Sequence, residues 1–183
     1  MGQNAVDIYF HDTYFVVAHF HLIMGVAAMF SIAAGTYYWF PKMYGRFMNE
    51  TLGKWHFWLT FIGVYSVFIP MHVMGMWGQP RRYSGFDYAF LQDPMIPSMH
   101  NMVTAAAFLA VLAQLIFIFN FFWSMYKGAQ AGEFTWNGTS LEWTTPSPPP
   151  WDNFGGKHPV VSHGPYEYSV PGAAKDFIMQ TDP

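Results

Sequence analysis

The chain has no cysteine and few charged residues. In 183 residues there is no Cys, and Asp, Glu, Lys and Arg together make up 10%, against roughly 25% in a typical soluble domain. The absence of Cys excludes disulfide scaffolds, thiolate metal sites and cysteine catalysis. The net charge of −3 gives no basic surface for a nucleic-acid partner. Because hydrophobic residues reach 52%, the composition also argues against a disordered chain.

Three long stretches contain no Asp, Glu, Lys or Arg. They cover residues 14–40, 55–77 and 97–126. A helix that crosses a membrane needs about 20 mostly apolar residues, and in lipid the backbone must satisfy its own hydrogen bonds. We therefore predict an all-α integral membrane protein with three membrane-spanning helices within residues 14–127. Buried helices of a large soluble protein are the alternative, but three such stretches in succession would be unusual there.

Proline and aromatic residues mark the ends of these stretches. Pro41 follows the first stretch and Pro80 closely follows the second. We expect the two helices to end at these positions, because proline lacks the amide hydrogen that a helix interior needs. Pro70 lies within the second stretch and is expected to kink it. Trp and Tyr gather near the ends, as in the aromatic belts of membrane proteins.

Basic residues predict the orientation of the helices. The loop 41–54 carries three basic residues and Lys127 closes the third stretch, so this side is expected to face the cytoplasm or the matrix. Residues 1–13 then form a segment on the outer face. Residues 128–183 are rich in Pro, Gly and aromatic residues without a sustained period. We expect this region to be an irregular, extended cytoplasmic tail.

Two histidines lie near the start of the first stretch. His19 and His21 are separated by about 200° around an α-helix, so they point to opposite sides and cannot chelate one metal. One helix could instead lie between two prosthetic groups, with Phe20 projecting between them. Ionisable residues inside a membrane helix are costly and usually functional, although a single histidine is often only a satisfied core residue. A neutral imidazole suits haem iron, and chlorophyll magnesium would accept it as well.

Two further pairs of residues are predicted on the same side of the membrane as these histidines. His11 and Asp12 precede the first stretch; such a pair suits Mg or Mn, and Asp12 could equally cap the helix. Arg81 and Arg82 follow the second stretch. Arginine is the favoured partner of carboxylates such as haem propionates, while a basic pair that flanks the membrane is the simpler alternative.

These runs resemble subunit I of the haem–copper terminal oxidases, specifically cytochrome c oxidase. The resemblance covers about residues 5–127 and implies that the three helices are the last three of the family's twelve core helices, in the C-terminal part of the subunit. The matching runs are His11-Asp12-Thr13-Tyr14-Phe15-Val16-Val17-Ala18-His19-Phe20-His21, Trp39-Phe40-Pro41, Phe61-Ile62-Gly63-Val64 and Pro80-Arg81-Arg82-Tyr83.

The resemblance implies two haems, expected to be A-type. His19 would be the proximal ligand of the high-spin haem, where oxygen is reduced. His21 would be one of two axial ligands of the low-spin haem, which receives electrons first. Phe20 would lie between the two haems. Copper would be present in the complex but would not be ligated by this chain.

The resemblance also implies roles for the residues on the outer face. His11 and Asp12 would help bind a Mg or Mn ion that does not change its redox state, near the interface with subunit II. Asp7 would contact a propionate of the high-spin haem. Arg81 and Arg82 would pair with haem propionates.

A chain of this kind would be inactive alone. In the family, the copper-ligating histidines, the second ligand of the low-spin haem and most of the proton-uptake channels lie on earlier helices. The resemblance therefore implies a split subunit whose companion chain carries the first nine helices. The other implied partners are subunit II with its copper centre, subunit III, cytochrome c as electron donor, and membrane lipid. The implied reaction is reduction of O2 to water coupled to proton translocation. The bacterial inner membrane is expected, with the mitochondrial inner membrane as the alternative.

Three other functions are consistent with parts of the sequence. A quinol oxidase of the same superfamily would keep the haem histidines and the arginine pair, and the predicted Mg or Mn pair favours the cytochrome c branch only modestly. A nitric oxide reductase is a more distant relative, and the runs 11–14 and 80–83 argue against it. A subunit without catalytic activity that binds pigment through His19 and His21 belongs to another class, which an optical spectrum would distinguish.

Overall fold

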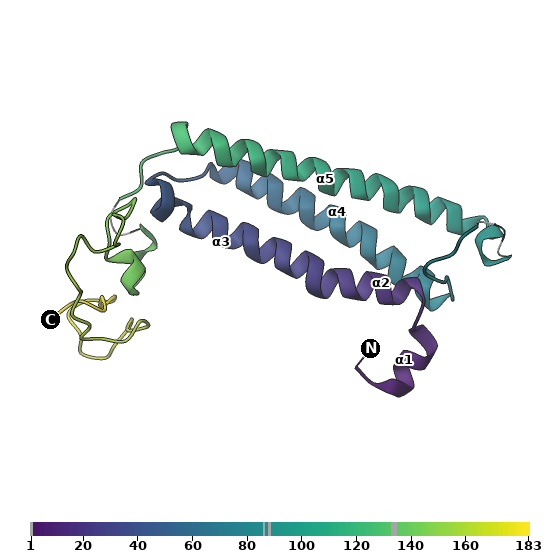
Figure 1. The fold of residues 1–183 in the computed structure, drawn as a ribbon, viewed down its shortest axis with the longest axis horizontal. Helices are drawn as coiled ribbons and strands as arrows, with labels where there is room; N and C mark the ends of the chain where they lie inside the picture. The colour runs from purple at the N-terminus through teal and green to yellow at the C-terminus, as the bar shows by residue number, and fades with distance from the viewer. Residues whose placement is uncertain (1, 86, 88, 133–134) are drawn as a thin grey trace. The chain divides into compact units, whose positions relative to one another are not determined.

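The protein is helical in a computed structural model that describes residues 2–85, 87, 89–132 and 135–183. Within these ranges there is no extended strand, only isolated β-bridges, which confirms the all-α prediction. The helices of Figure 1 are α1 (Asn4–Phe10), α2 (Tyr14–Phe20), the π-helical segment η1 (His21–Val26), α3 (Ala27–Tyr44), α4 (Glu50–Met76) and α5 (Met95–Lys127). The short 3-10 turns are η2 (Ala89–Gln92), η3 (Thr135–Asn137) and η4 (Leu141–Trp143).

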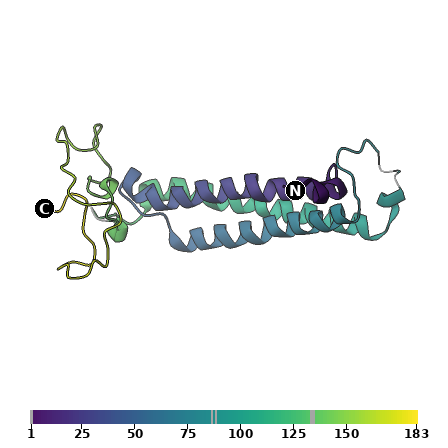
Figure 2. The same cartoon turned by 90° about the horizontal axis from the view of Figure 1, so that it is seen from below.

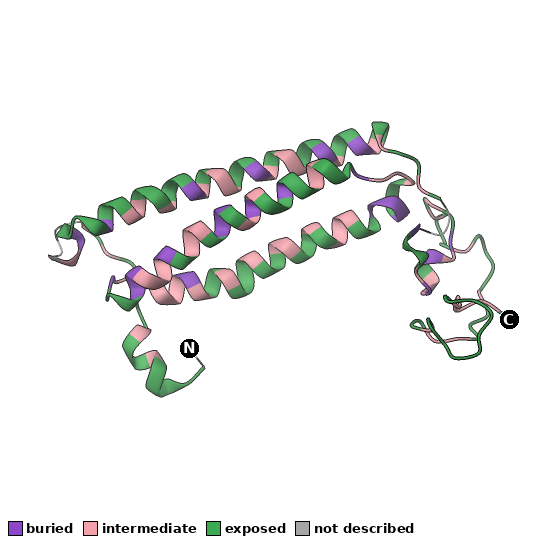
Figure 3. Ribbon diagram, turned by 180° about the vertical axis from the view of Figure 1, so that it is seen from behind, coloured by how far each residue is buried: buried purple, intermediate pink, exposed green. Residues whose placement is uncertain are grey.

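Three helical segments are long and apolar enough to cross a membrane. They are Tyr14–Tyr44, Glu50–Met76 and Met95–Lys127, and they confirm the three predicted spans. Few of their residues are buried, and most of the three helices is coloured green (exposed) or pink (intermediate) in Figure 3. The exposed side chains include large apolar residues such as Phe108 and Leu112. Exposed apolar side chains along a whole helix are stable only against lipid or another apolar surface.

The first span ends later than the sequence predicts. Pro41 lies inside α3, which continues to Tyr44, so the prediction that the helix ends at Pro41 is wrong. A proline removes one amide hydrogen but still offers its own carbonyl, and the Pro41 carbonyl accepts a hydrogen bond from Gly45 N at 2.8 Å. Gly45 has a φ of +65°, a conformation that favours glycine and commonly ends a helix.

The second span behaves as predicted at its end. Helix α4 stops at Met76, and Gly78 follows with a φ of +91°. The helix is continuous through Pro70, and the kink expected there stays a prediction.

The chain forms two compact units. The first contains Met1–Ala33 and Glu50–Phe119. In it, α2 and η1 pack against α4, and the two close approaches between helices occur at glycines. A Cβ added to Gly75 would meet the backbone of Phe15 on α2, and one added to Gly63 would lie 2.9 Å from Ala110 on α5. Small residues let membrane helices approach closely, so these glycines hold α2, α4 and α5 side by side (Figures 1 and 2).

The second unit contains Ala34–Asn49 and Asn120–Pro183. The indole of Trp143 is fully buried, with its ring edge-on to Tyr38 at 5.2 Å between centroids. Lys42 Nζ lies over the same ring and donates a 2.6 Å hydrogen bond to the Thr145 carbonyl. The tail is irregular, as predicted, and these contacts fold its first part back onto the end of α3.

Hydrogen bonds around Gln180 organise the rest of the tail. The Gln180 carbonyl accepts from Ser162 N at 2.9 Å, and Gln180 N donates to the Thr139 carbonyl at 3.1 Å. The side-chain oxygen of Gln180 accepts from Leu141 N at 2.9 Å. Because one residue joins three separate segments, the tail has a defined path without regular secondary structure.

Candidate functional site

The two candidate ligand histidines lie where an α-helix changes into a π-helix. Thr13 caps α2, since its hydroxyl accepts a hydrogen bond from Phe15 N at 3.2 Å. His19 lies in the last turn of α2, and His21 is the first residue of η1. Short π-helical insertions are rare and occur frequently at functional sites. The change in helix type could not be predicted from residue spacing.

Hydrogen bonding shows which nitrogen of the His21 ring carries the hydrogen. Its Nδ1 lies 2.7 Å from the Val17 carbonyl. A carbonyl can only accept, so Nδ1 carries the hydrogen, and the neutral imidazole then presents an unprotonated Nε2. The ring also stacks on Phe68, with 5.4 Å between centroids. A histidine held in this way by its other nitrogen has the arrangement typical of a metal ligand.

An apolar pocket of about 240 Å³ lies beside His21. Its walls come from η1, α3, α4 and α5, and the exposed wall surface is almost entirely apolar. The lining residues are His21, Gly25, Val26, Met29, Val64, Phe68, Ala110, Val111 and Gln114. Apolar walls with one imidazole at the edge suit a flat apolar macrocycle with an axially ligated metal, so the residues present fit a haem.

His19 has a different set of neighbours. Its ring stacks over Phe15 and lies edge-on to His72, with 6.5 Å between centroids in each case. Within the described ranges its ring nitrogens have no hydrogen-bond partner, so either one is available to a metal. His72 is held in turn, since its Nδ1 donates to the Phe68 carbonyl at 2.7 Å. No sequence pattern singles out His72, because it is a lone histidine within an apolar span.

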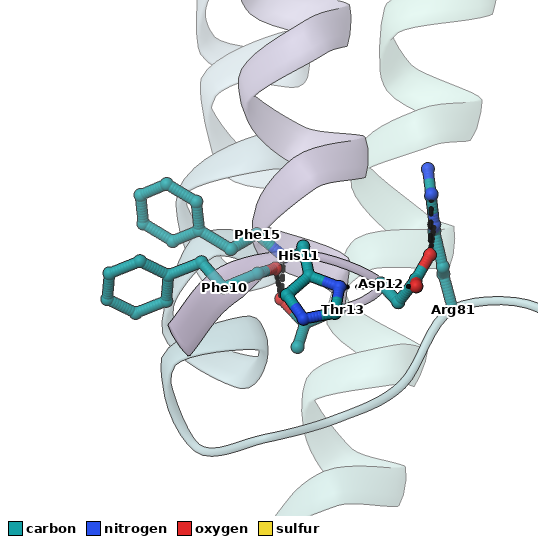
Figure 4. Close-up of polar contacts among 6 residues, drawn as sticks. All are labelled: Phe10, His11, Asp12, Thr13, Phe15 and Arg81. Atoms are coloured by element: carbon teal, nitrogen blue, oxygen red, sulfur yellow. Dashed lines mark hydrogen bonds and ion pairs between the residues drawn. The ribbon is translucent and has the colours of Figure 1, made fainter. Parts of the chain in front are cut away.

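The outer-face residues His11, Asp12 and Arg81 form one connected group (Figure 4). Arg81 donates to Asp12 Oδ1 from Nε at 3.0 Å and from Nη2 at 2.6 Å. His11 Nδ1 lies 3.3 Å from the other carboxylate oxygen of Asp12. The Arg81 guanidinium holds the pKa of the Asp12 carboxyl below its ordinary value, and the His11 ring makes a smaller contribution in the same direction. Both groups favour the charged form of the carboxyl.

The structure decides against one role that the sequence left open for Asp12. Asp12 does not cap α2, because Thr13 does. Asp12 has a φ of +59°, and its carboxylate is bound to Arg81 instead. Within the described residues, no three His, Asp or Glu side chains gather into a metal site, so His11 and Asp12 offer at most part of a coordination sphere.

The arginine pair is partly engaged within the chain. Arg81 N donates to the Asp12 carbonyl at 2.9 Å, so its backbone and side chain are both tied to that residue. A guanidinium has five N–H donors, and the two bonds to Asp12 leave others for an anion. Arg82 has a φ of +60°, an uncommon and strained conformation for a residue with a Cβ. Such strain is frequent at ligand-binding sites.

Asp7 and Phe20 are the two remaining residues for which the sequence predicts a role at the haems. Asp7 is partly buried on α1, and its carbonyl accepts from His11 N at 2.7 Å. Phe20 is half exposed and lies edge-on to the His21 ring, with 5.3 Å between centroids.

Comparison with known proteins identifies the family. Residues 1–112 match the model of the family described as "Cytochrome C and Quinol oxidase polypeptide I". The chain belongs to this family. It therefore corresponds to part of subunit I of the haem–copper oxidases, an integral membrane protein, and the resemblance found in the sequence is confirmed.

The curated relatives of this oxidase chain carry the names of oxidase subunits. The chain is 45% identical to the alternative cytochrome c oxidase subunit 1 of Bradyrhizobium diazoefficiens, over 100% of this chain and 31% of the relative. It is 44% identical to cytochrome c oxidase subunit 1 of Thermostichus vulcanus, over 93% of this chain and 30% of the relative. It is 41% identical to cytochrome c oxidase subunit 1 of Cereibacter sphaeroides, over 84% of this chain and 27% of the relative. The oxidase chain thus spans about a third of the length of these relatives.

Proposed function

We propose that this chain supplies the C-terminal helices of the catalytic subunit of a proton-pumping cytochrome c oxidase, in which His19 and His21 ligate two haem irons. The observation that carries the proposal is the arrangement around His21. Its Nδ1 is bound to the Val17 carbonyl and its ring borders an apolar pocket, two residues from a second histidine, in a chain that belongs to the oxidase family. Bound haems, expected to be A-type, would supply electron transfer and the reduction of oxygen.

The chain's own residues hold and orient the two ligands. The Val17 carbonyl orients the His21 ring through its hydrogen bond to Nδ1, and the Phe68 ring stacks on it. Phe15 and His72 fix the His19 ring from two sides. Because both histidines are on one continuous helical segment, their separation is set by backbone hydrogen bonds rather than by a loop.

We propose that the outer-face group binds anions and a cation in the assembled enzyme. The guanidinium groups of Arg81 and Arg82 would pair with haem propionates, and Asp7 would lie near one of them. His11 and Asp12 would provide two ligands of a Mg or Mn ion, with the remaining ligands from subunit II or water. The chemistry of the donors fits, because carboxylate and imidazole suit Mn and a carboxylate suits Mg.

The rest of the catalytic subunit must come from outside residues 1–183. It would carry the first nine helices, the copper ligands and the second ligand of the low-spin haem. We propose that this chain joins those helices in the bacterial inner membrane, with its N-terminal segment outside and its tail in the cytoplasm. Subunits II and III would complete the complex, and cytochrome c would donate electrons. The bacterial sources and the names of its relatives support this version over a mitochondrial one.

A quinol oxidase is the second candidate, because the family description includes both kinds of enzyme. The names of the relatives reported above favour cytochrome c. Turnover of the purified complex with reduced cytochrome c or with a quinol separates the two.

The ligand assignment is tested by substitution and chemical rescue. We expect His21→Gly, in the complex purified through this chain, to lose the optical signal of the low-spin haem and to keep that of the high-spin haem. Added imidazole should restore the lost signal, because it replaces the missing ligand without a covalent link. His19→Gly should show the reverse pattern. His158→Gln, at an exposed tail position, is the matched control and should keep both signals.

Retention of the low-spin signal in His21→Gly would refute the assignment of that ligand. Loss of both signals, with no recovery in imidazole, would mean that His21 has a folding role instead.

A further inference from the structure

Gln79 is a fully buried polar residue two positions before Arg81, the first residue of the arginine pair. It follows the end of α4, and its side chain has no exposed surface. Its Nε2–H group donates to His100 Nε2 on α5 at 2.9 Å. Within the described residues, the side-chain oxygen of Gln79 is buried without a hydrogen-bond partner. A buried oxygen of this kind destabilises a fold, and a leucine of similar size would not. Stability alone therefore does not explain a glutamine here.

The backbone of Gln79 joins the same loop to two helices. Gln79 N donates to the Met74 carbonyl of α4 at 3.0 Å, and the Gln79 carbonyl accepts from Tyr14 N, the first residue of α2, at 2.9 Å. Thr13 and Pro80 form an isolated β-bridge. The loop is thus fastened beside the start of the helix that carries His19 and His21.

A second side-chain contact lies next to the first. The hydroxyl groups of Tyr14 and Tyr83 are 3.2 Å apart, and the Tyr14 ring lies edge-on to His100, with 5.8 Å between centroids. Gln79 and Tyr83 therefore hold the loop on both sides of Arg81 and Arg82. An apolar cluster around Met74 packs against both tyrosines, and the contact between their hydroxyl groups is partly buried.

We propose that Gln79 and His100 are positioning residues that lock the loop 79–83 onto α5 and so fix the guanidinium groups of Arg81 and Arg82 relative to His19 and His21. This inference rests on the proposed function, in which the two arginines pair with the haem propionates. A guanidinium held close to a propionate stabilises the reduced haem, which carries one positive charge fewer. A loosened loop would let the cation move into water and would lower the haem potential.

The test replaces each partner in the purified oxidase complex. Gln79→Leu and His100→Leu remove the hydrogen bond and keep a similar volume. We expect both variants to keep the optical signals of both haems. Their amide hydrogen exchange in residues 77–85 should be faster. The equilibrium constant for reduction of at least one haem should fall on the order of tenfold, by analogy with other residues that support metal ligands, which corresponds to about 59 mV for one electron.

Rescue separates positioning from a general folding defect. His100→Gln restores a side chain that can bond to Gln79, and it should return both the exchange rate and the potential toward those of the unaltered complex. The matched control is Asn120→Leu, which removes a buried amide that belongs to the other compact unit. It should change neither quantity. If Gln79→Leu prevents assembly, Tyr83→Phe loosens the same loop through its other contact and is expected to shift the same two quantities.

Unchanged exchange and unchanged potentials in Gln79→Leu and His100→Leu would overturn the proposal. Faster exchange without a shift in potential would also overturn it, because the loop would then have no effect on the haems. Absence of haem from the unaltered complex would refute the proposed function instead, and it is visible before any substitution is made.

Discussion

Gly75 is the position where the contact between α2 and α4 can be tested most sharply. A Cβ added there would lie 2.7 Å from Phe15 Cα and 2.8 Å from Phe15 Cβ, with Phe15 N closer still. These atoms belong to or directly adjoin the backbone of α2, so they cannot rotate away. To bring Phe15 Cα alone to the 3.4 Å of an ordinary contact, the start of α2 must move away from α4 by about 0.7 Å, and the closer Phe15 N requires a larger movement.

The free-energy change of Gly75→Ala follows from two opposing effects. Extra volume in a packed interface costs about 1–3 kcal/mol, and a direct backbone clash belongs at the upper end of this range. Alanine in place of glycine inside a helix gains about 1 kcal/mol. The steric effect dominates, and we expect a net destabilisation of about 2 kcal/mol. Because α2 carries His19, and His21 follows it directly, the displacement should also perturb the haem spectra.

The assay is unfolding of the purified complex in a graded denaturant, followed by the haem spectra. Gly35→Ala on α3 is the matched control. The nearest atom to its added Cβ is Cζ3 of Trp39 at 3.1 Å, which belongs to a half-exposed side chain that can rotate. If Gly75→Ala is as stable as Gly35→Ala and has unchanged spectra, α2 and α4 do not approach each other as described.

Two further predictions concern the outer-face group and the tail. The Arg81 guanidinium holds the pKa of Asp12 below its ordinary value of 3.8; the ion pair is therefore fully formed above pH 3.8 and is lost as the pH falls through the lower value in the folded chain. Infrared titration of the labelled carboxyl should show Arg81→Gln raising this pKa, and an unchanged pKa would contradict the pairing. Trp143→Ala removes the buried anchor of the tail and is expected to cost about 3–5 kcal/mol within its unit. Limited proteolysis should then cut the tail faster, whereas the fully exposed Trp151 replaced by Ala should have no effect; equal cleavage of the two variants would count against the anchor.

The sequence predicts the parts of the site that lie close together along the chain. The pair His19 and His21 is visible at once, because two ionisable residues in an apolar span are unusual. The Pro80–Tyr83 run is recognisable for the same reason, since two arginines stand at the end of a stretch without charge. Both runs lie within residues 1–112, the part of the chain that matches the family model.

The sequence does not predict which residues meet across the helices. The ion pair of Asp12 with Arg81 and the hydrogen bond of Gln79 with His100 join residues far apart in the chain. His72 contacts the His19 ring although nothing in its sequence neighbourhood suggests it. Such contacts depend on the packing of α2, α4 and α5, and packing depends on the shape of each helix surface rather than on composition.

The sequence also leaves the ends of helices open where two neighbouring residues can each begin or end a helix. Asp12 and Thr13 are both suitable caps for α2, and only the backbone path, which turns at Asp12 with a positive φ, selects Thr13. Pro41 is a plausible helix end, but the helix reaches Tyr44 because Gly45 supplies a better one.

The sequence by itself determined that this protein has three helices able to cross the membrane and carries two candidate ligand histidines on the first of them. The physical reason is that lipid tolerates few charges and leaves the backbone no partner except itself, so composition is enough. Only the tertiary structure decided how the histidine rings are held, which cap begins α2 and how the arginine loop is fastened. These depend on distances of a few ångströms between separate helices, which no property of a single stretch of sequence fixes.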